Sequence, residues 1–393
     1  MHADVSRTPT ARIDDRHRLV GPEARLRVDA SACLPVRYAD GQECGLCQAA
    51  CPVHAIEMQA TGPRLRTDCI GCGQCWTACP TGALNVDGFA LPNTLALQEG
   101  DALWVDCWRV QFPESPRGAL RVPCLAGIGA GWLLALFELA AAQGERPIIL
   151  LDRGACENCA AGAGMATLRA TLDEAGRLLS ACGVGSNVLP RLTALPVAGR
   201  LEPTIPTSAG ETRVDRRSFF RGLMGGLVRG AEQVAAASVG NDDLITLRNH
   251  AAPLEHMRIV TALTAIAGRH GRTIPAQALP KVSLGECNAH GVCAKVCPTG
   301  ALVREDAGDA VELKFFAARC IACGQCARSC PDRAISVTAA GGNAVVEVLA
   351  HWQTRHCEVC GEAFVAATGA TCAACTKHQQ LFQGMTALFQ PSA

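Results

Sequence analysis

One cysteine motif constrains this chain more than any other feature. Residues 69–80 read Cys-Ile-Gly-Cys-Gly-Gln-Cys-Trp-Thr-Ala-Cys-Pro, a C-x2-C-x2-C-x3-C-P spacing, and a near copy occupies residues 320–331. Three thiolates spaced in this way can wrap around a compact multi-iron cluster, whereas a single zinc ion would not need so many ligands from one loop. The fourth cysteine lies one helical turn further on, where it ligates the other cluster of a pair. A complete motif that occurs twice argues against a disulfide knot.

The motif resembles that of bacterial-type two-cluster ferredoxins, and this resemblance implies 4Fe–4S clusters in pairs. A first motif precedes residue 69, but an insertion, Leu34–Glu43, separates its first cysteine from the other three. The crossed pattern of the family implies one cluster on Cys33, Cys44, Cys47 and Cys79, and another on Cys51, Cys69, Cys72 and Cys75. Because of the insertion, Cys33 is either a ligand or a free core thiol.

A second module of the same kind is expected near the C-terminus, with one departure. Its first motif reads Cys287-Asn-Ala-His290-Gly-Val-Cys293-Ala-Lys-Val-Cys297, so a histidine replaces the second cysteine. His290 ligates iron, or the site holds a 3Fe–4S cluster on Cys287, Cys293 and Cys330, or the histidine faces solvent beside a four-iron cluster that carries an exogenous ligand. The loss of one negatively charged thiolate ligand raises the reduction potential of a cluster. We therefore expect this cluster to have the highest reduction potential of the four ferredoxin-type clusters. The partner cluster is expected on Cys297, Cys320, Cys323 and Cys326.

The segment between the two modules has a different character, because strand and helix patterns alternate along it. Strands are expected over Ala102–Asp106, Leu120–Pro123 and Pro147–Asp152, and helices over Trp132–Ala142 and Met165–Cys182. This alternation predicts an α/β domain with a parallel sheet. The apolar run at 125–142 is long enough that a membrane-spanning helix is an alternative. Its glycines, its one glutamate and the adjoining strands favour a buried helix.

Four cysteines of this segment follow the expected strands: Cys107, Cys124, Cys156 and Cys159. Carboxyl ends of parallel strands open on one edge, and four thiolates that meet there suit a 2Fe–2S cluster. The layout resembles the small iron–sulfur (delta, MvhD-like) subunit of methanogen hydrogenases, which passes electrons to heterodisulfide reductase. A zinc site or buried free thiols are the alternatives. Cys182, at a helix end, is expected to be a core thiol.

An Arg-Arg segment, Arg216-Arg-Ser-Phe-Phe-Arg221, lies in the stretch before the second module. It resembles the start of NapF-type ferredoxins, the accessory ferredoxins of periplasmic nitrate reductase operons, and this resemblance suggests a fusion of two ancestral units. An ordinary basic helix start is the alternative. A twin-arginine export signal would have to be terminal.

Two C-x2-C pairs close the chain, eleven residues apart, and four thiolates in two turns make a closed tetrahedral site. Structural zinc in a zinc ribbon is the expected occupant, and rubredoxin-like iron is the alternative. The metal would supply folding energy to a module too small for its own core. The ligands would be Cys357, Cys360, Cys372 and Cys375.

The cysteine usage also bears on compartment and partners. Almost all of the 24 cysteines stand in C-x2-C or C-x3-C groups, which indicates metal ligation in a reducing compartment. The N-terminus has no apolar segment typical of a secretory signal, so we expect a cytoplasmic protein. Lys plus Arg and Asp plus Glu both number 36, so the charge balance provides no basic field for nucleic acid.

These patterns predict an α+β multidomain chain, in which two ferredoxin-like modules flank an α/β parallel-sheet domain and a zinc ribbon follows. The expected boundaries are a tail at 1–31, a ferredoxin module at 32–98, the α/β domain at 99–195, a linker with helices at 196–279, a ferredoxin module at 280–350 and the zinc ribbon at 351–393.

The predicted function is electron transfer to or from a cytoplasmic oxidoreductase such as a hydrogenase, a formate dehydrogenase or another molybdoenzyme. The expected cofactors are three or four 4Fe–4S clusters, one 2Fe–2S cluster and zinc. We expect no catalytic site in the chain itself, and redox proteins as its partners. An assembly factor for such an enzyme is the alternative.

Overall fold

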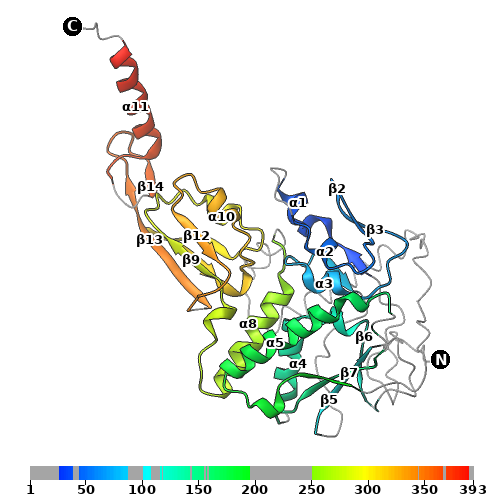
Figure 1. Ribbon diagram of the computed structural model, residues 1–393. Helices are drawn as coiled ribbons and strands as arrows, with labels where there is room; N and C mark the ends of the chain where they lie inside the picture. Colours follow the sequence, from blue (N-terminus) through cyan, green and yellow to red (C-terminus); the bar gives the residue numbers. More distant parts are fainter. Residues whose placement is uncertain are drawn as a thin grey trace, which may run out of the picture. The chain divides into compact units, whose positions relative to one another are not determined.

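The computed structural model describes residues 26–38, 44–86, 101–107, 116, 118–141, 144–154, 156, 159–194, 250–343, 345–365 and 369–388. The chain divides into two compact units, Met1–Pro275 and Ala276–Ala393, and each is described by itself (Figure 1). The Arg-Arg segment and the helix expected after it lie outside the described residues.

The first unit begins with a small module made of two antiparallel ribbons and three short helices. Strand β1 (Leu26–Val28) pairs with β4 (Leu84–Val86), and β2 (Ile56–Gln59) pairs with β3 (Gly62–Leu65). Helices α1 (Leu34–Arg37), α2 (Leu46–Ala49) and α3 (Gln74–Ala78) carry the cysteine motifs. Strand β1 corrects the expected tail at 1–31, because Leu26 and Val28 pack against the core around Ile56 and Leu84.

The α/β part of this unit contains a parallel sheet in the order β6-β5-β7-β8, as the alternation of patterns predicts. Its strands are β5 (Leu103–Cys107), β6 (Leu120–Val122), β7 (Ile148–Asp152) and β8 (Arg191–Ala194). Strand β8 has no clear sequence signal, because this half-exposed strand at the edge of the sheet lacks the apolar run of β7.

Helix α4 (Ala130–Ala141) forms most of the apolar run for which a membrane-spanning helix was the alternative. It packs against α5 (Met165–Ala181) and α8 (Leu254–Arg269), and Trp132, Leu133 and Phe137 are among its buried residues. The carboxylate of Glu255, in the first turn of α8, accepts the backbone N–H of Gly131 at 2.7 Å. Helix α8 therefore packs on the α/β part, although it was expected in the 196–279 linker. No helix within the described ranges is long and apolar enough to cross a membrane.

The second unit repeats the cysteine-bearing layout and adds a longer sheet. Strand β9 (Lys281–Leu284) pairs with β12 (Ile335–Thr338), and the short helices are α9 (Val292–Lys295) and α10 (Gln325–Arg328). A four-stranded sheet has the order β10 (Leu302–Ala307), β11 (Ala310–Phe316), β13 (Val346–His356) and β14 (Ala363–Val365). Helix α11 (Ala373–Leu388) follows.

Strand β13 corrects the boundary expected at residue 350, because it runs through that position without a break (Figure 1). Its first part pairs with β11, where Trp352 lies opposite Val311 and both are buried. Its last residues pair with β14, beside the C-terminal cysteines. One strand thus belongs to both the ferredoxin-like module and the C-terminal module. Short 3-10 helices cover Ala30–Ala32, Leu125–Gly127, Gly162–Gly164, Ser186–Val188, Ala276–Ala278 and Ala317–Arg319.

Candidate metal centres

The first cysteine set lines a hollow between α1, α2 and the end of α3. Its space is about 320 Å³, and its sulfur-bearing residues are Cys33, Cys44, Cys47 and Cys79. Cys33 immediately precedes α1, so the insertion Leu34–Glu43 does not move it away from the other three. Burial raises the pKa of the Cys47 thiol to about 11, and Cys79, Cys44 and Cys33 add to the rise. The structure therefore brings together the four residues of the predicted crossed set.

The second set gathers around the loop before α3. Its hollow, about 300 Å³, is lined by Cys51, Cys69, Cys72 and Cys75 together with apolar side chains such as Ile56. Gly71 and Gly73 have positive φ values of 64° and 78°, which let the loop turn tightly between its cysteines. The backbone N–H of Ala55 donates to Sγ of Cys51 at 3.2 Å.

The ordinary set of the second unit has the same construction. Its hollow, about 330 Å³, is lined by Cys297, Cys320, Cys323 and Cys326. The N–H of Ala301 donates to Sγ of Cys297 at 3.2 Å, and that of Ala322 donates to Sγ of Cys320 at 3.4 Å. Hollows with the same four-thiol lining suit one kind of occupant.

The fourth set contains the histidine. Burial raises the pKa of the Cys293 thiol, and Cys287 and Cys330 add to the rise, so these three thiols lie together as predicted. Nδ1 of His290 lies 3.0 Å from Oδ2 of Asp332, which lies outside the cysteine motifs. The carboxylate of Asp332 also accepts the backbone N–H of Asn288 at 3.4 Å. The only feature of the sequence that pointed to Asp332 was its position two residues after Cys330, a predicted ligand of the same site.

The donor sets fit iron–sulfur clusters. Each combines clustered cysteines that are buried or half-buried, and backbone N–H groups donate to several of the sulfur atoms. Burial raises the pKa of Cys320 to about 12, so a neutral thiol is the stable form of such a side chain without metal. Iron binding would stabilise the thiolate, and the N–H donors would hydrogen-bond to its sulfur.

The cysteines of the α/β part lie at the carboxyl ends of adjacent strands, as predicted. Cys107 is the last residue of β5, Cys124 follows β6, and Cys156 and Cys159 follow β7. Burial raises the pKa of Cys156 to about 11, and Cys124, Asp152 and Cys159 add to the rise. Sγ of Cys107 lies 3.6 Å from the carbonyl oxygen of Pro123, the residue before Cys124. Cys182 is fully buried, as expected of a core thiol.

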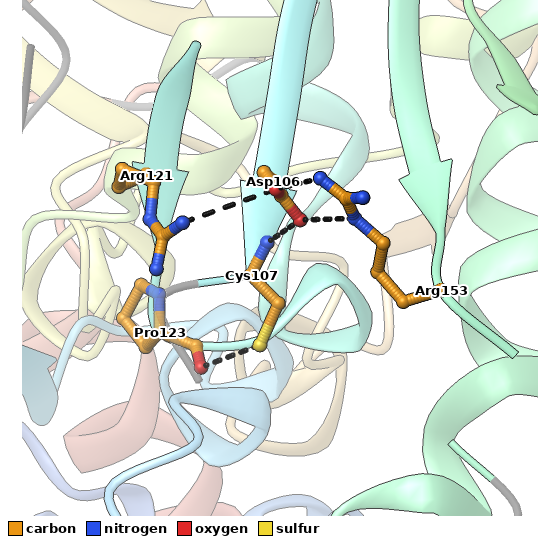
Figure 2. Close-up of polar contacts among 5 residues, drawn as sticks. All are labelled: Asp106, Cys107, Arg121, Pro123 and Arg153. Atoms are coloured by element: carbon orange, nitrogen blue, oxygen red, sulfur yellow. Dashed lines mark hydrogen bonds and ion pairs between the residues drawn. The ribbon is translucent and has the colours of Figure 1, made fainter. Parts of the chain in front are cut away.

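A buried charge network fixes the three strand ends (Figure 2). The carboxylate of Asp106 accepts two hydrogen bonds from Arg153, at 2.6 and 3.3 Å, and lies 3.9 Å from the guanidinium of Arg121. It also accepts the backbone N–H of Cys107 at 2.8 Å. All three charged side chains are buried, so one carboxylate joins the ends of β5, β6 and β7 from which the cysteines project.

The C-terminal cysteines form a tighter group than the others. Their sulfur atoms all lie within 4.8 Å of one another, and Sγ of Cys360 is 3.8 Å from Sγ of Cys372. A tetrahedral ion with Zn–S bonds of about 2.3 Å has S–S edges of about 3.8 Å. Backbone N–H groups of Cys372 and Cys360 lower the pKa of Cys357 to about 6. This group, Cys357, Cys360, Cys372 and Cys375, could hold one metal ion.

Comparison with known families supports the ferredoxin interpretation. Residues 42–83 match a family model described as a 4Fe-4S dicluster domain, and residues 286–335 match a second model with the same description. The chain contains two 4Fe–4S dicluster ferredoxin domains. Such domains indicate an iron–sulfur electron-transfer protein. The family match to residues 42–83 does not include Cys33. The evidence that Cys33 belongs with Cys44, Cys47 and Cys79 comes from the hollow that these residues line in the structure. No curated protein matches the chain at a significant level.

Proposed function

We propose that the chain is a multicluster relay that carries single electrons to or from an oxidoreductase. One observation carries the proposal: the crossed grouping of cysteines in both ferredoxin domains. Three cysteines of one motif stand with the last cysteine of the other motif, so two sites share a short stretch of chain. Sites joined in this way hold their clusters as neighbours.

In this proposal the residues of the chain do three things. The cysteines would hold the clusters, the surrounding apolar side chains keep water away, and backbone N–H groups such as that of Ala55 donate to sulfur. Clusters bound at these sites would supply one-electron chemistry, with potentials set by ligand charge, hydrogen bonding and burial. His290 would make its site the one with the highest potential, because an imidazole carries less negative charge than a thiolate.

Two further centres belong to the proposal. A 2Fe–2S cluster would bind to Cys107, Cys124, Cys156 and Cys159, and zinc to the C-terminal group. The ends of three parallel strands support the first assignment, and the 3.8 Å sulfur separation between Cys360 and Cys372 supports the second. Such a zinc ion would anchor the end of β13 and the start of α11 rather than take part in electron transfer.

The partner in this proposal is a cytoplasmic oxidoreductase: a hydrogenase, a formate dehydrogenase or another molybdoenzyme. Rapid reduction or oxidation of the purified protein by one of these mature enzymes would support a relay. Co-purification with the immature, cofactor-free form, without electron exchange with the mature enzyme, would favour an assembly factor instead.

The deciding experiment is an anaerobic determination of iron, sulfide and zinc per chain, combined with a redox titration followed by EPR. Counting the proposed sites with their usual nuclearities, we expect about sixteen to eighteen irons and one zinc. Low-potential one-electron couples should account for the iron. A preparation that holds mostly zinc, from expression with full iron–sulfur assembly capacity, would refute the relay.

A further inference from the structure

Gln74 links the second cluster site of the first ferredoxin domain to the cysteines of the α/β part. Its backbone lies between Cys72 and Cys75, at the start of α3, but its side chain is buried against the α/β part. Nε2 donates to the carbonyl oxygen of Ala161 at 3.0 Å and lies 4.0 Å from Sγ of Cys124. One amide group therefore reaches two of the three α/β segments that carry these cysteines, the one with Cys124 and the one with Cys156 and Cys159.

The Ala161 carbonyl belongs to the turn that carries Cys156 and Cys159. In that turn the N–H of Cys159 donates to the carbonyl of Cys156, and the N–H of Gly162 donates to that of Cys159. A bond to Ala161 thus fixes this turn relative to the loop that contains Cys72.

The backbone that follows Cys124 can approach the backbone around Cys72 and Gln74 only because residue 127 is a glycine. A Cβ atom at Gly127, just after Cys124, would lie 2.5 Å from the carbonyl oxygen of Cys72 and 3.4 Å from the backbone nitrogen of Gln74. Such a contact with backbone cannot be relieved by rotating a side chain. Cys72 and Cys124 are also close enough for the charge of Cys124 to contribute to the raised pKa of Cys72, after burial, the main cause.

The equivalent glutamine of the second ferredoxin domain behaves differently. Gln325 has the same place in its motif and is also buried. Its Nε2 donates to Oγ of Ser329 at 3.2 Å, and its Oε1 accepts from Arg328 at 2.9 Å, all within one short helical segment. The motif itself therefore does not require the outward hydrogen bonds that Gln74 makes.

We propose that Gln74 is a positioning residue that holds the α/β cysteine site against the site of Cys51, Cys69, Cys72 and Cys75. Groups bound at the two sites would then be magnetic and electrostatic neighbours. The N–H directed at Cys124 would also raise the potential of the group bound there, because a hydrogen bond to sulfur stabilises the reduced form. This inference rests on the 2Fe–2S assignment of the proposed function.

The test compares full-length Gln74→Leu and Gln74→Glu with Gln325→Leu as the matched control. Iron, sulfide and circular dichroism are measured first, so that a folding defect is recognised. EPR spectra of the dithionite-reduced proteins then report the spin–spin interaction between neighbouring clusters, and a redox titration gives each potential. The glutamate variant keeps the shape of the side chain but removes the N–H donor, so it remains informative if the leucine variant does not fold.

We expect both Gln74 variants to weaken the spin–spin splitting between the clusters at the two sites. They should also lower the reduction potential of the cluster in the α/β part. Gln325→Leu should leave both quantities unchanged. An unchanged splitting and α/β potential in well-folded Gln74 variants would overturn the proposal. A wild-type protein with four ferredoxin-type signals but no 2Fe–2S signal would also overturn it and leave the ferredoxin relay intact. Absence of every cluster signal would instead count against the proposed function itself.

Discussion

The carboxylate of Asp332 lies 3.0 Å from Nδ1 of His290, the residue that replaces a cysteine in the first motif of the second ferredoxin domain. Histidines that bind a metal through one ring nitrogen commonly donate the other N–H to a carboxylate, which fixes the tautomer and the ring orientation. A proton on Nδ1 would leave Nε2 as the atom with a free lone pair. This pairing favours His290 as a ligand over a histidine that simply faces solvent.

The first prediction concerns the charge of this site. His290→Cys restores the C-x2-C-x2-C-x3-C spacing, so we expect a four-iron cluster with four thiolates and a lower potential than in the wild type. Redox titration followed by EPR would measure the shift. Asp332→Asn is the companion variant, because it keeps the size of the side chain but weakens the hold on the imidazole. It should lower the affinity of this site for iron by about 10- to 100-fold. An unchanged cluster type and unchanged order of potentials in His290→Cys would contradict the ligand assignment.

A second prediction separates a ligand role for Cys33 from that of a core thiol. Cys33→Ser should remove or destabilise one cluster, so that about four of the irons are lost on desalting. Cys182→Ser is the matched control, because Cys182 is fully buried and only burial raises the pKa of its thiol. The control should keep all of its iron. If Cys33→Ser also keeps it, the hollow beside α1 holds no cluster that depends on this residue.

Asp106 should be one of the most sensitive positions for stability, because its loss leaves Arg121 and Arg153 buried without their shared carboxylate. Breaking a buried pair of this kind costs about 3–5 kcal/mol. We therefore expect Asp106→Ala to lower the midpoint of anaerobic urea unfolding strongly. Glu138→Ala, which removes a half-exposed ion pair with Arg269, should cost about 1 kcal/mol or less. Equal midpoints for the two variants would show that the network in Figure 2 does not stabilise the strand ends.

Local patterns in the sequence were sufficient to predict much of the fold. The helix expected over Met165–Cys182 is α5 with one residue fewer, and the apolar run Pro147–Asp152 is β7 with one residue fewer. These elements follow from periodicity and burial within a single segment. The crossed pattern of the ferredoxin family likewise predicted which thiols would lie together, although the insertion left the role of Cys33 open and the structure then placed that residue beside Cys44, Cys47 and Cys79.

The features that sequence reasoning missed all depend on contacts between distant segments. Strand β1 forms because β4, almost sixty residues later, offers it a partner. Strand β13 passes through the expected boundary at residue 350 because β11 pairs with its first part and β14 with its last. Gln74 and Gln325 occupy the same motif position, yet only the fold distinguishes the partners of their amide groups. Spacing predicts ligands well because a cluster is held locally, but it contains no information on packing partners.

The last prediction distinguishes the C-terminal metal from the clusters. Cys360→Ser should reduce zinc by one per chain and leave iron and sulfide unchanged, because the four sulfur atoms lie at distances that suit a single ion. Metal analysis of the anaerobically purified variant would check this, and Cys323→Ser is the control, since it should lower iron but not zinc. We also expect trypsin to cleave the zinc-free protein after Arg355 and Lys377, which flank the four cysteines, more readily than the wild type, because a structural zinc supplies much of the folding free energy of a small module. Iron in place of zinc, with a rubredoxin-like absorption spectrum, would reassign the metal but not its ligands. Retention of full zinc in Cys360→Ser would exclude that residue as a ligand.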